Sequence, residues 1–275
     1  MGLRITTNMS SIAAQRSLMA QTKRQEHASK ALASGQRITQ AADDSAGLAI
    51  AESMKADIRG TQQARSNALN AISTIQVGEG GLSEQANLIV RLRELGVQSA
   101  TDTLGDKERY YLQQEASSIA QEIDRISKTT KFGDKNLLDG SAPKFDFHVG
   151  SNADKFNIIT HQVEGDATLS GLGLDGIDIS SKDGARDLLG TLDAALETVS
   201  RMRSGFGAVQ SRLESTVNGL DVKNENLQGA RSRIMDADVA KESADMASAN
   251  VLQQASISVL AQANQSPMSA IKLIG

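Results

Sequence analysis

The sequence predicts a mainly α protein, a long antiparallel coiled-coil or helix bundle made from both chain ends with one small β-hairpin region. Apolar residues recur every third and then fourth residue from Leu192 to Leu227, which places a narrow apolar stripe along a helix. Pro143 and Pro267 are the only prolines, so the chain has room for very long helices. Trp is absent and only 2 Tyr and 5 Phe occur, which indicates a thin interior built by helix packing.

Composition excludes several classes of function. The formal net charge is −4 with both signs interspersed, so no polybasic field exists for nucleic acid or anionic lipid. The absence of Cys excludes a disulfide scaffold and a thiolate metal site. No apolar run reaches the roughly 18 residues of a membrane span, and the N-terminus lacks the apolar segment of a signal peptide. We therefore expect a helical assembly protein that does not insert into membranes.

The first third of the chain predicts two helices and a connector. Residues 3–34 form an amphipathic helix in which Ile5, Met9 and Ile12 share one face, and Gly35 ends it. Residues 36–47 are polar and irregular, which predicts a connector, and Asp44 or Ser45 caps the next helix.

A helical hairpin follows. Residues 46–100 form its first helix, and the glycines at 78, 80 and 81 indicate a bend or a close helix approach. A turn at Gly105-Asp106 leads to a second striped helix around residues 112–126.

Residues 132–179 are the one region with strand character. Residues 145–149 alternate in polarity, residues 150–154 are typical of a turn, and residues 156–158 resume the extended pattern. This β-hairpin is too small for its own core, so we expect it to lie on the helices.

The central helix supplies a hydrophobic seam that needs the hairpin helices as partners. Two polar positions, Thr216 and Lys223, predict that the seam loosens near the end of this helix. The apolar residues on which the seam depends are Leu192, Val199, Phe206, Leu213, Leu220 and Leu227.

The last helix is predicted over residues 234–264 and ends before Pro267. Its broad apolar face includes Leu252, Ala255, Val259 and Leu260. Residues 1–35 are net basic and residues 236–275 net acidic, so we expect the two chain ends to pair. A pair of helices leaves apolar surface exposed, and that surface predicts assembly with copies of the same molecule.

Three patterns resemble catalytic or ligand sites without their usual context. The glycines at 171, 173 and 176 spell the dinucleotide fingerprint, yet no strand and immediate helix flank them, so we favour a Gly-rich loop. The three histidines are too dispersed for a metal site, and Asp43-Asp44 favours helix capping over paired-carboxylate catalysis. We predict no catalytic, cofactor-binding or metal residues, hence no enzyme.

The sequence resembles bacterial flagellin over nearly its whole length, in a minimal form without variable outer domains. The similar blocks are Ile5-Thr6-Thr7-Asn8, residues 33–38, 42–51, 93–99 and 122–126, Ala237-Asp238, residues 252–255, and residues 258–265 (SVLAQANQ). This resemblance implies a structural subunit of the flagellar filament, which assembles by coupled folding of its terminal helices into a helical tube for motility.

The resemblance also implies a domain division and a set of partners. Residues 1–44 and 233–275 would form an inner domain, and residues 45–232 a core domain with the small β region. The subunit would be secreted to the extracellular filament through the flagellar export apparatus. Its partners would be its own copies, a secretion chaperone, the filament cap and the hook-junction proteins.

Family members of this type contact host innate receptors through residues that Arg91, Leu95 and Glu115 match. Val90 departs from the pattern, since a glutamine usually precedes that arginine. Three alternatives remain open at this stage: a hook–filament junction protein, a type III translocator that inserts amphipathic helices into membranes, and an enzyme built on the Gly-rich loop.

Overall fold

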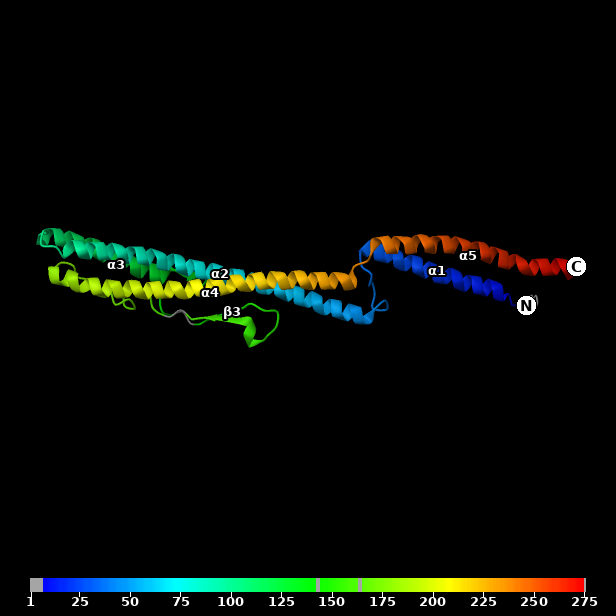
Figure 1. Ribbon diagram of the computed structural model, residues 1–275, viewed down its shortest axis with the longest axis horizontal. Coiled ribbons are helices and arrows are strands. Elements are labelled where there is room, and N and C mark those ends of the chain that lie inside the picture. Colours follow the sequence, from blue (N-terminus) through cyan, green and yellow to red (C-terminus); the bar gives the residue numbers. More distant parts are fainter. Residues whose placement is uncertain (1–6, 142–143, 163–164, 275) are drawn as a thin grey trace. The chain divides into compact units, whose positions relative to one another are not determined.

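The computed structural model describes residues 7–141, 144–162 and 165–274, and it confirms the predicted mainly α fold (Figure 1). In these ranges the helices are α1 (Met9–Ser34), α2 (Ser45–Ser99), α3 (Asp106–Thr129), α4 (Lys182–Met235) and α5 (Val239–Ile274), with a 3-10 turn at Lys155–Asn157. The strands are β1 (Lys131–Phe132), β2 (Lys135–Asn136), β3 (Phe145–His148) and β4 (Ile158–His161).

The chain divides into two compact units, each of which contains both early and late residues. A terminal unit comprises residues 1–57 and 226–275, and a core unit comprises residues 58–225. Helices α2 and α4 contribute residues to both units.

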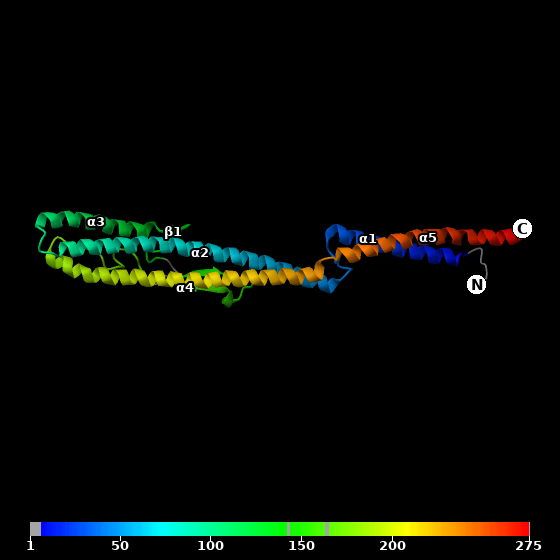
Figure 2. The ribbon, with the colours of Figure 1, turned by 45° about the horizontal axis from the view of Figure 1, so that its top comes forward.

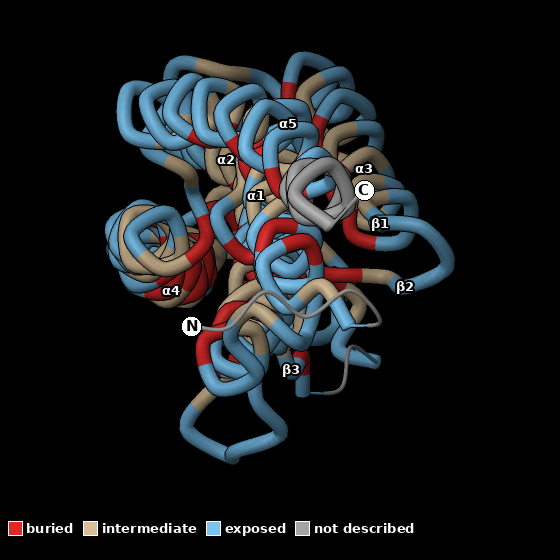
Figure 3. Tube along the Cα trace, turned by 90° about the vertical axis from the view of Figure 1, so that its right-hand side faces the viewer, coloured by how far each residue is buried: buried red, intermediate tan, exposed pale blue. Residues whose placement is uncertain are grey.

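The core unit is a bundle of three helices, α2, α3 and α4, which lie side by side in two views (Figures 1 and 2). Its hydrophobic core draws on all three helices, as predicted from the repeating apolar residues. Leu82 and Ile89 of α2, Ile123 of α3 and Leu213 of α4 are each completely buried. Figure 3 shows the buried part of α4 on one side of the helix and exposed residues on the other.

The hydrophobic seam on α4 lies where it was predicted, except at its polar positions. Five of its six predicted apolar residues are buried, namely Leu192, Val199, Phe206, Leu213 and Leu220, and Leu227 is half-buried. The predicted polar positions are less buried than the residues that follow them: Thr216 is half-buried beside buried Val217, and Lys223 is exposed beside half-buried Asn224. Leu213, Leu220 and Leu227 are seven residues apart, and a polar or apolar position can lie three or four residues after each. Spacing alone therefore does not distinguish Thr216 from Val217.

A buried amide links three parts of the core unit. Gln85 on α2 has no solvent exposure, and its Nε2 donates to the carbonyls of Ile123 and Ala167, both at 3.0 Å. One side chain therefore ties α2 to α3 and to the loop that precedes α4.

The glycines at 78, 80 and 81 do not break α2, which runs unbroken from Ser45 to Ser99. Two of them permit close approach, which was one of the two predicted outcomes. A Cβ on Gly78 would lie 3.0 Å from Phe206 Cε2, and a Cβ on Gly81 would lie 2.7 Å from Thr130 Oγ1. Gly80 faces open space.

The β region contains two antiparallel pairs, β1–β2 and β3–β4. The predicted first strand is confirmed as β3, but the second was placed too early. Phe156 belongs to the 3-10 turn, and β4 begins only at Ile158. In the β3–β4 pair, Phe145 lies opposite His161 and His148 lies opposite Ile158. Asn67 Nδ2 donates to the His148 carbonyl at 3.0 Å, which attaches the hairpin to α2.

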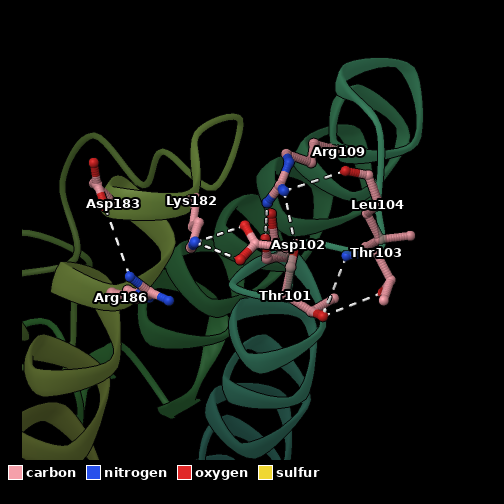
Figure 4. Close-up of polar contacts among 9 residues, drawn as sticks. Thr101, Asp102, Thr103, Leu104, Arg109, Lys182, Asp183 and Arg186 are labelled. Atoms are coloured by element: carbon pink, nitrogen blue, oxygen red, sulfur yellow. Dashed lines mark hydrogen bonds and ion pairs between the residues drawn. The ribbon is translucent and has the colours of Figure 1, made fainter.

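Polar contacts close one end of the core unit (Figure 4). The buried Arg109 guanidinium donates to the carbonyls of Ser99, Thr101 and Leu104, so the turn between α2 and α3 has a charged donor at its centre. Lys182 Nζ lies 2.6 Å from Asp102 Oδ1 and joins this turn to the start of α4. The hydrogen bond from Lys182 lowers the pKa of the Asp102 carboxyl.

Neighbouring glycines provide a matched test of helix approach. Gly80→Ala should stabilise the protein by about 0.5–1 kcal/mol, because alanine favours helix and the new methyl meets nothing. Gly81→Ala should be less stable than Gly80→Ala by about 1–3 kcal/mol, because its Cβ would lie 2.8 Å from buried Leu138. Urea unfolding followed by circular dichroism measures both, and equal stability of the two variants would contradict this packing.

Candidate assembly surface on the terminal helices

Small side chains form the interface between α1 and α5. The two helices lie side by side and run antiparallel (Figures 1 and 2), which confirms the predicted pairing of the chain ends. The buried residues of α1 are Ser11, Ala14, Ala28 and Ala31, and those of α5, within the part whose side chains are described (residues 239–265), are Ala249, Ser256 and Ala263. We call this set the terminal interface. Alanine and serine side chains remove little apolar area from water, so the pair gains little free energy from burial.

Larger apolar residues of the same helices are exposed. Met9, Met19, Val251 and Val259 are 62%, 66%, 67% and 57% exposed. We use the name outer apolar residues for one set of exposed side chains on these helices: Met9, Ile12, Met19, Val251, Leu252, Ile257 and Val259. Large apolar side chains in water along two paired helices are typical of a surface that another protein covers.

The predicted assembly residues fall mostly on this exposed side. Met9, Ile12, Leu252, Ala255 and Val259 are exposed, and Leu260 is half-buried. Ile5 lies outside the described residues. The polar and small members of the terminal interface, such as Ser11, Ser256 and Ala263, were missed, although spacings of three residues on α1 and seven on α5 are present in the sequence.

The predicted last helix differs from the observed one at both ends. Helix α4 ends at Met235 and α5 starts at Val239, where the Asp238 side chain accepts from the backbone N–H of Ala240 at 2.9 Å. This N-cap explains the break. The prediction that the helix ends before Pro267 is wrong, since α5 continues to Ile274.

Backbone contacts join the connector after α1 to the break between α4 and α5. Gly35 ends α1 with a φ of 68°, as predicted, and its carbonyl accepts from Ala237 N at 3.0 Å. Arg37 donates from its backbone to Met235 and from its guanidinium to the Ile234 carbonyl at 2.8 Å. Behind these contacts, Ile38, Ala51 and Met235 form a small core within the terminal unit.

Asp43 and Asp44 are adjacent, but each accepts hydrogen bonds from a different part of the chain. Asp44 Oδ1 accepts from Gly47 N at 2.8 Å and caps α2, as one of the two predicted candidates. Asp43 accepts hydrogen bonds from Thr39 and Gln40, two from each, and lies 3.6 Å from His27 Nε2. Partial burial raises the pKa of the Asp43 carboxyl, but hydrogen bonds from Gln40 and Thr39 outweigh it and lower that pKa to about 2.

A cleft of about 480 Å³ lies between α1 and α5. Lys23, Arg24 and His27 line one side, and Glu242 and Asp245 line the other. The two signs of charge offset each other, so the cleft does not favour an anion or a cation. Within the described ranges, no group of three His, Cys, Asp or Glu side chains could hold a metal ion.

The residues that match a receptor contact do not all reach the surface. Arg91 and Glu115 are exposed and form an ion pair at 2.8 Å, and Arg91 also lies 2.9 Å from Glu94. The hydrogen bond to Glu115 raises the pKa of the Arg91 guanidinium. Leu95 is 1% exposed, so its side chain packs in the core and offers a receptor no surface in this structure.

The Gly-rich pattern forms a loop. Gly173 and Gly176 have φ of 69° and 76°, which suits turns, and α4 begins only at Lys182. In the described part of this region, no helix starts at the glycines, so the phosphate-binding geometry of a dinucleotide fold is missing.

Two family models match the chain. The bacterial flagellin N-terminal helical region matches residues 5–142, and the bacterial flagellin C-terminal helical region matches residues 189–274. The chain belongs to the bacterial flagellin family. The two matched regions contain α1 and α5, which carry the terminal interface and the outer apolar residues.

Curated relatives match the chain over almost its full length. The chain is 39% identical to a flagellin of Halalkalibacterium halodurans, over 98% of this chain and 99% of that protein. It is 39% identical to the flagellar filament 33 kDa core protein of Treponema phagedenis and 36% identical to a flagellin of Bacillus subtilis. The match to the Treponema phagedenis protein covers 98% of this chain and 99% of that protein. The match to the Bacillus subtilis flagellin covers 99% of this chain and 100% of that protein. This chain therefore resembles flagellins that lack a large variable domain.

The crystal structure of Bacillus cereus flagellin has a similar fold. Its TM-score is 0.50 at 23% identity, over 56% of this chain and 88% of that chain. No helix in the described part of the sequence is both long enough and apolar enough to span a membrane.

Acid should weaken the connector through Asp43. Its folded-state pKa of about 2 lies below the ordinary value of 3.8, so its stabilising effect is complete above about pH 4 and is lost as pH falls through 2. Asp43→Asn should be less stable than the parent at pH 7 and equally stable near pH 2. Urea unfolding between pH 2 and 7 measures this, and parallel pH profiles would contradict the role of Asp43.

Proposed function

We propose that the chain is a structural subunit of the bacterial flagellar filament and that its terminal helices drive self-assembly into a helical tube for motility. The observation that carries this proposal is the exposure of the outer apolar residues on two helices that pair through alanine and serine. Copies of the same chain would bury that surface. The filament-protein relatives support the proposal by their names and by full-length similarity.

Coupled folding of the terminal helices with assembly follows from the same observation. A helix pair with a small-residue interface gains little from burial, whereas ordering its backbone costs about 1–2 kcal/mol per residue. Neighbouring subunits would supply the missing apolar contacts. We assign residues 1–44 and 233–275 to the inner domain and residues 45–232 to the core domain.

The proposed role includes partners besides copies of the chain. The subunit passes through the flagellar export apparatus to the extracellular filament, with a secretion chaperone, the filament cap and hook-junction proteins as its partners. Exposed apolar residues of α5, such as Val251 and Val259, give a chaperone a surface to cover before assembly.

Contact with a host innate receptor is a separate part of the proposal. It rests on Arg91 and Glu115, whose paired side chains are exposed on α2 and α3. Leu95 would support this surface from the core. Flagellins are structural proteins, and no catalytic role is proposed.

Electron microscopy of the concentrated, salt-precipitated chain tests the function directly. Long tubular filaments support a filament subunit. Soluble monomers under all conditions would refute it and would favour a junction protein, whereas leakage from liposomes would favour a translocator.

Substitution of the outer apolar residues should impair assembly without unfolding the subunit. Val251→Ser and Val259→Ser should each raise the critical concentration for polymerisation at least about tenfold, since burial of a valine contributes about 1.5–3 kcal/mol. Both residues are exposed in the single subunit, so thermal unfolding of the monomer should change little.

Val222→Ser is the matched control for these two variants. Val222 lies on α4 of the core unit and is 58% exposed. Sedimentation assays should show a smaller effect for this variant. An equal effect of all three substitutions would refute the assignment of assembly to the terminal helices.

A further inference from the structure

Pro267 leaves one carbonyl of α5 without its usual helical donor. Proline has no backbone N–H, so the carbonyl four residues earlier, that of Ala263, cannot form its hydrogen bond within the helix. Ala263 belongs to the terminal interface and is 8% exposed. A free carbonyl in a residue so little exposed is stabilised by another donor.

Asn8 supplies that donor from the other end of the chain. Its Nδ2 donates to the Ala263 carbonyl at 2.7 Å, while its Oδ1 accepts from Ser11 N at 3.1 Å as the N-cap of α1. Beside this contact, Ser11 Oγ donates to Asn264 Oδ1 at 2.9 Å. The amide serves both tasks because it carries an acceptor and a donor on one short side chain. Aspartate and serine at this position could cap the helix, but the first lacks the donor and the second is too short to reach.

The small residues of α5 alone do not define one register. Ala249, Ser256 and Ala263 repeat every seven residues, so a slide of two turns along α5 again presents a small residue to α1. Pro267 is the only proline in either helix, so the carbonyl that it frees occurs once along the interface. A bond to this carbonyl therefore distinguishes one register from its neighbours.

We propose that Asn8 is a register-setting residue that pairs α1 with α5 by binding the carbonyl that Pro267 frees. This inference rests on the proposed function, since the register places the outer apolar residues for contact with other subunits. Asn8 acts through helix position and need not touch another subunit.

A double-mutant cycle tests the proposal on the full-length chain. Asn8→Ser keeps the cap and removes the donor to Ala263, so it should raise the critical concentration for polymerisation about tenfold. Pro267→Ala restores the N–H that can bind the Ala263 carbonyl within α5. In that background the effect of Asn8→Ser should fall below about threefold. Asn8→Asp, which also caps but cannot donate, should show the same dependence on Pro267 as Asn8→Ser.

Helix content and thermal melting of the monomers, followed by circular dichroism, provide a second readout of the same cycle. Coupling between positions 8 and 267 in either readout supports the proposal. Equal effects of the Asn8 variants in both backgrounds, or no effect in either readout, would overturn it. If the parent chain forms no filaments, the proposed function fails, and the monomer cycle alone then decides the role of Asn8.

Discussion

The rest of the terminal unit depends on the contact between alanine and serine side chains of α1 and α5. Residues such as Ala28 and Ala249 allow the two helices to meet, but their methyl groups contribute little apolar burial. The larger side chains of the same helices, such as Met19 and Val251, consequently remain in water. A helix pair of this kind is marginal alone and gains most of its stability when neighbours cover the outer apolar residues.

The core unit has the opposite distribution of side chains. Leu82, Ile89 and Leu213 are completely buried, the Gln85 amide connects three segments, and the Arg109 guanidinium closes one end. This unit has the apolar burial that a stable fold requires, whereas α1 and α5 of the terminal unit keep most of their large apolar side chains exposed. A subunit divided in this way can fold its core first and order its ends during assembly.

The sequence predicted the features that depend on repeating large apolar residues. The helical hairpin and the α4 seam follow from periodic Leu, Ile and Val, and the structure contains both. The pairing of the chain ends follows from their apolar faces and opposite net charge, and the structure contains it too. Prediction failed where periodicity was ambiguous or where tertiary contacts decide. In the seam, Val217 is buried rather than its neighbour Thr216, since both lie within the same turn of α4. Helix α5 continues past Pro267, and Asn8 donates a hydrogen bond to the Ala263 carbonyl that Pro267 leaves without a helical donor. The small residues of the terminal interface carry no hydrophobic signal, so Ser11 and Ser256 went unrecognised.

Hydrogen exchange of monomer and filament, followed by mass spectrometry, tests the central claim most directly. Amides in α1 and α5 should exchange rapidly in the monomer and become protected in the filament. Amides in the core-unit parts of α2, α3 and α4 should be protected in both states. Strong protection of α1 and α5 in the monomer, equal to that of the core unit, would contradict the claim that assembly stabilises the terminal helices.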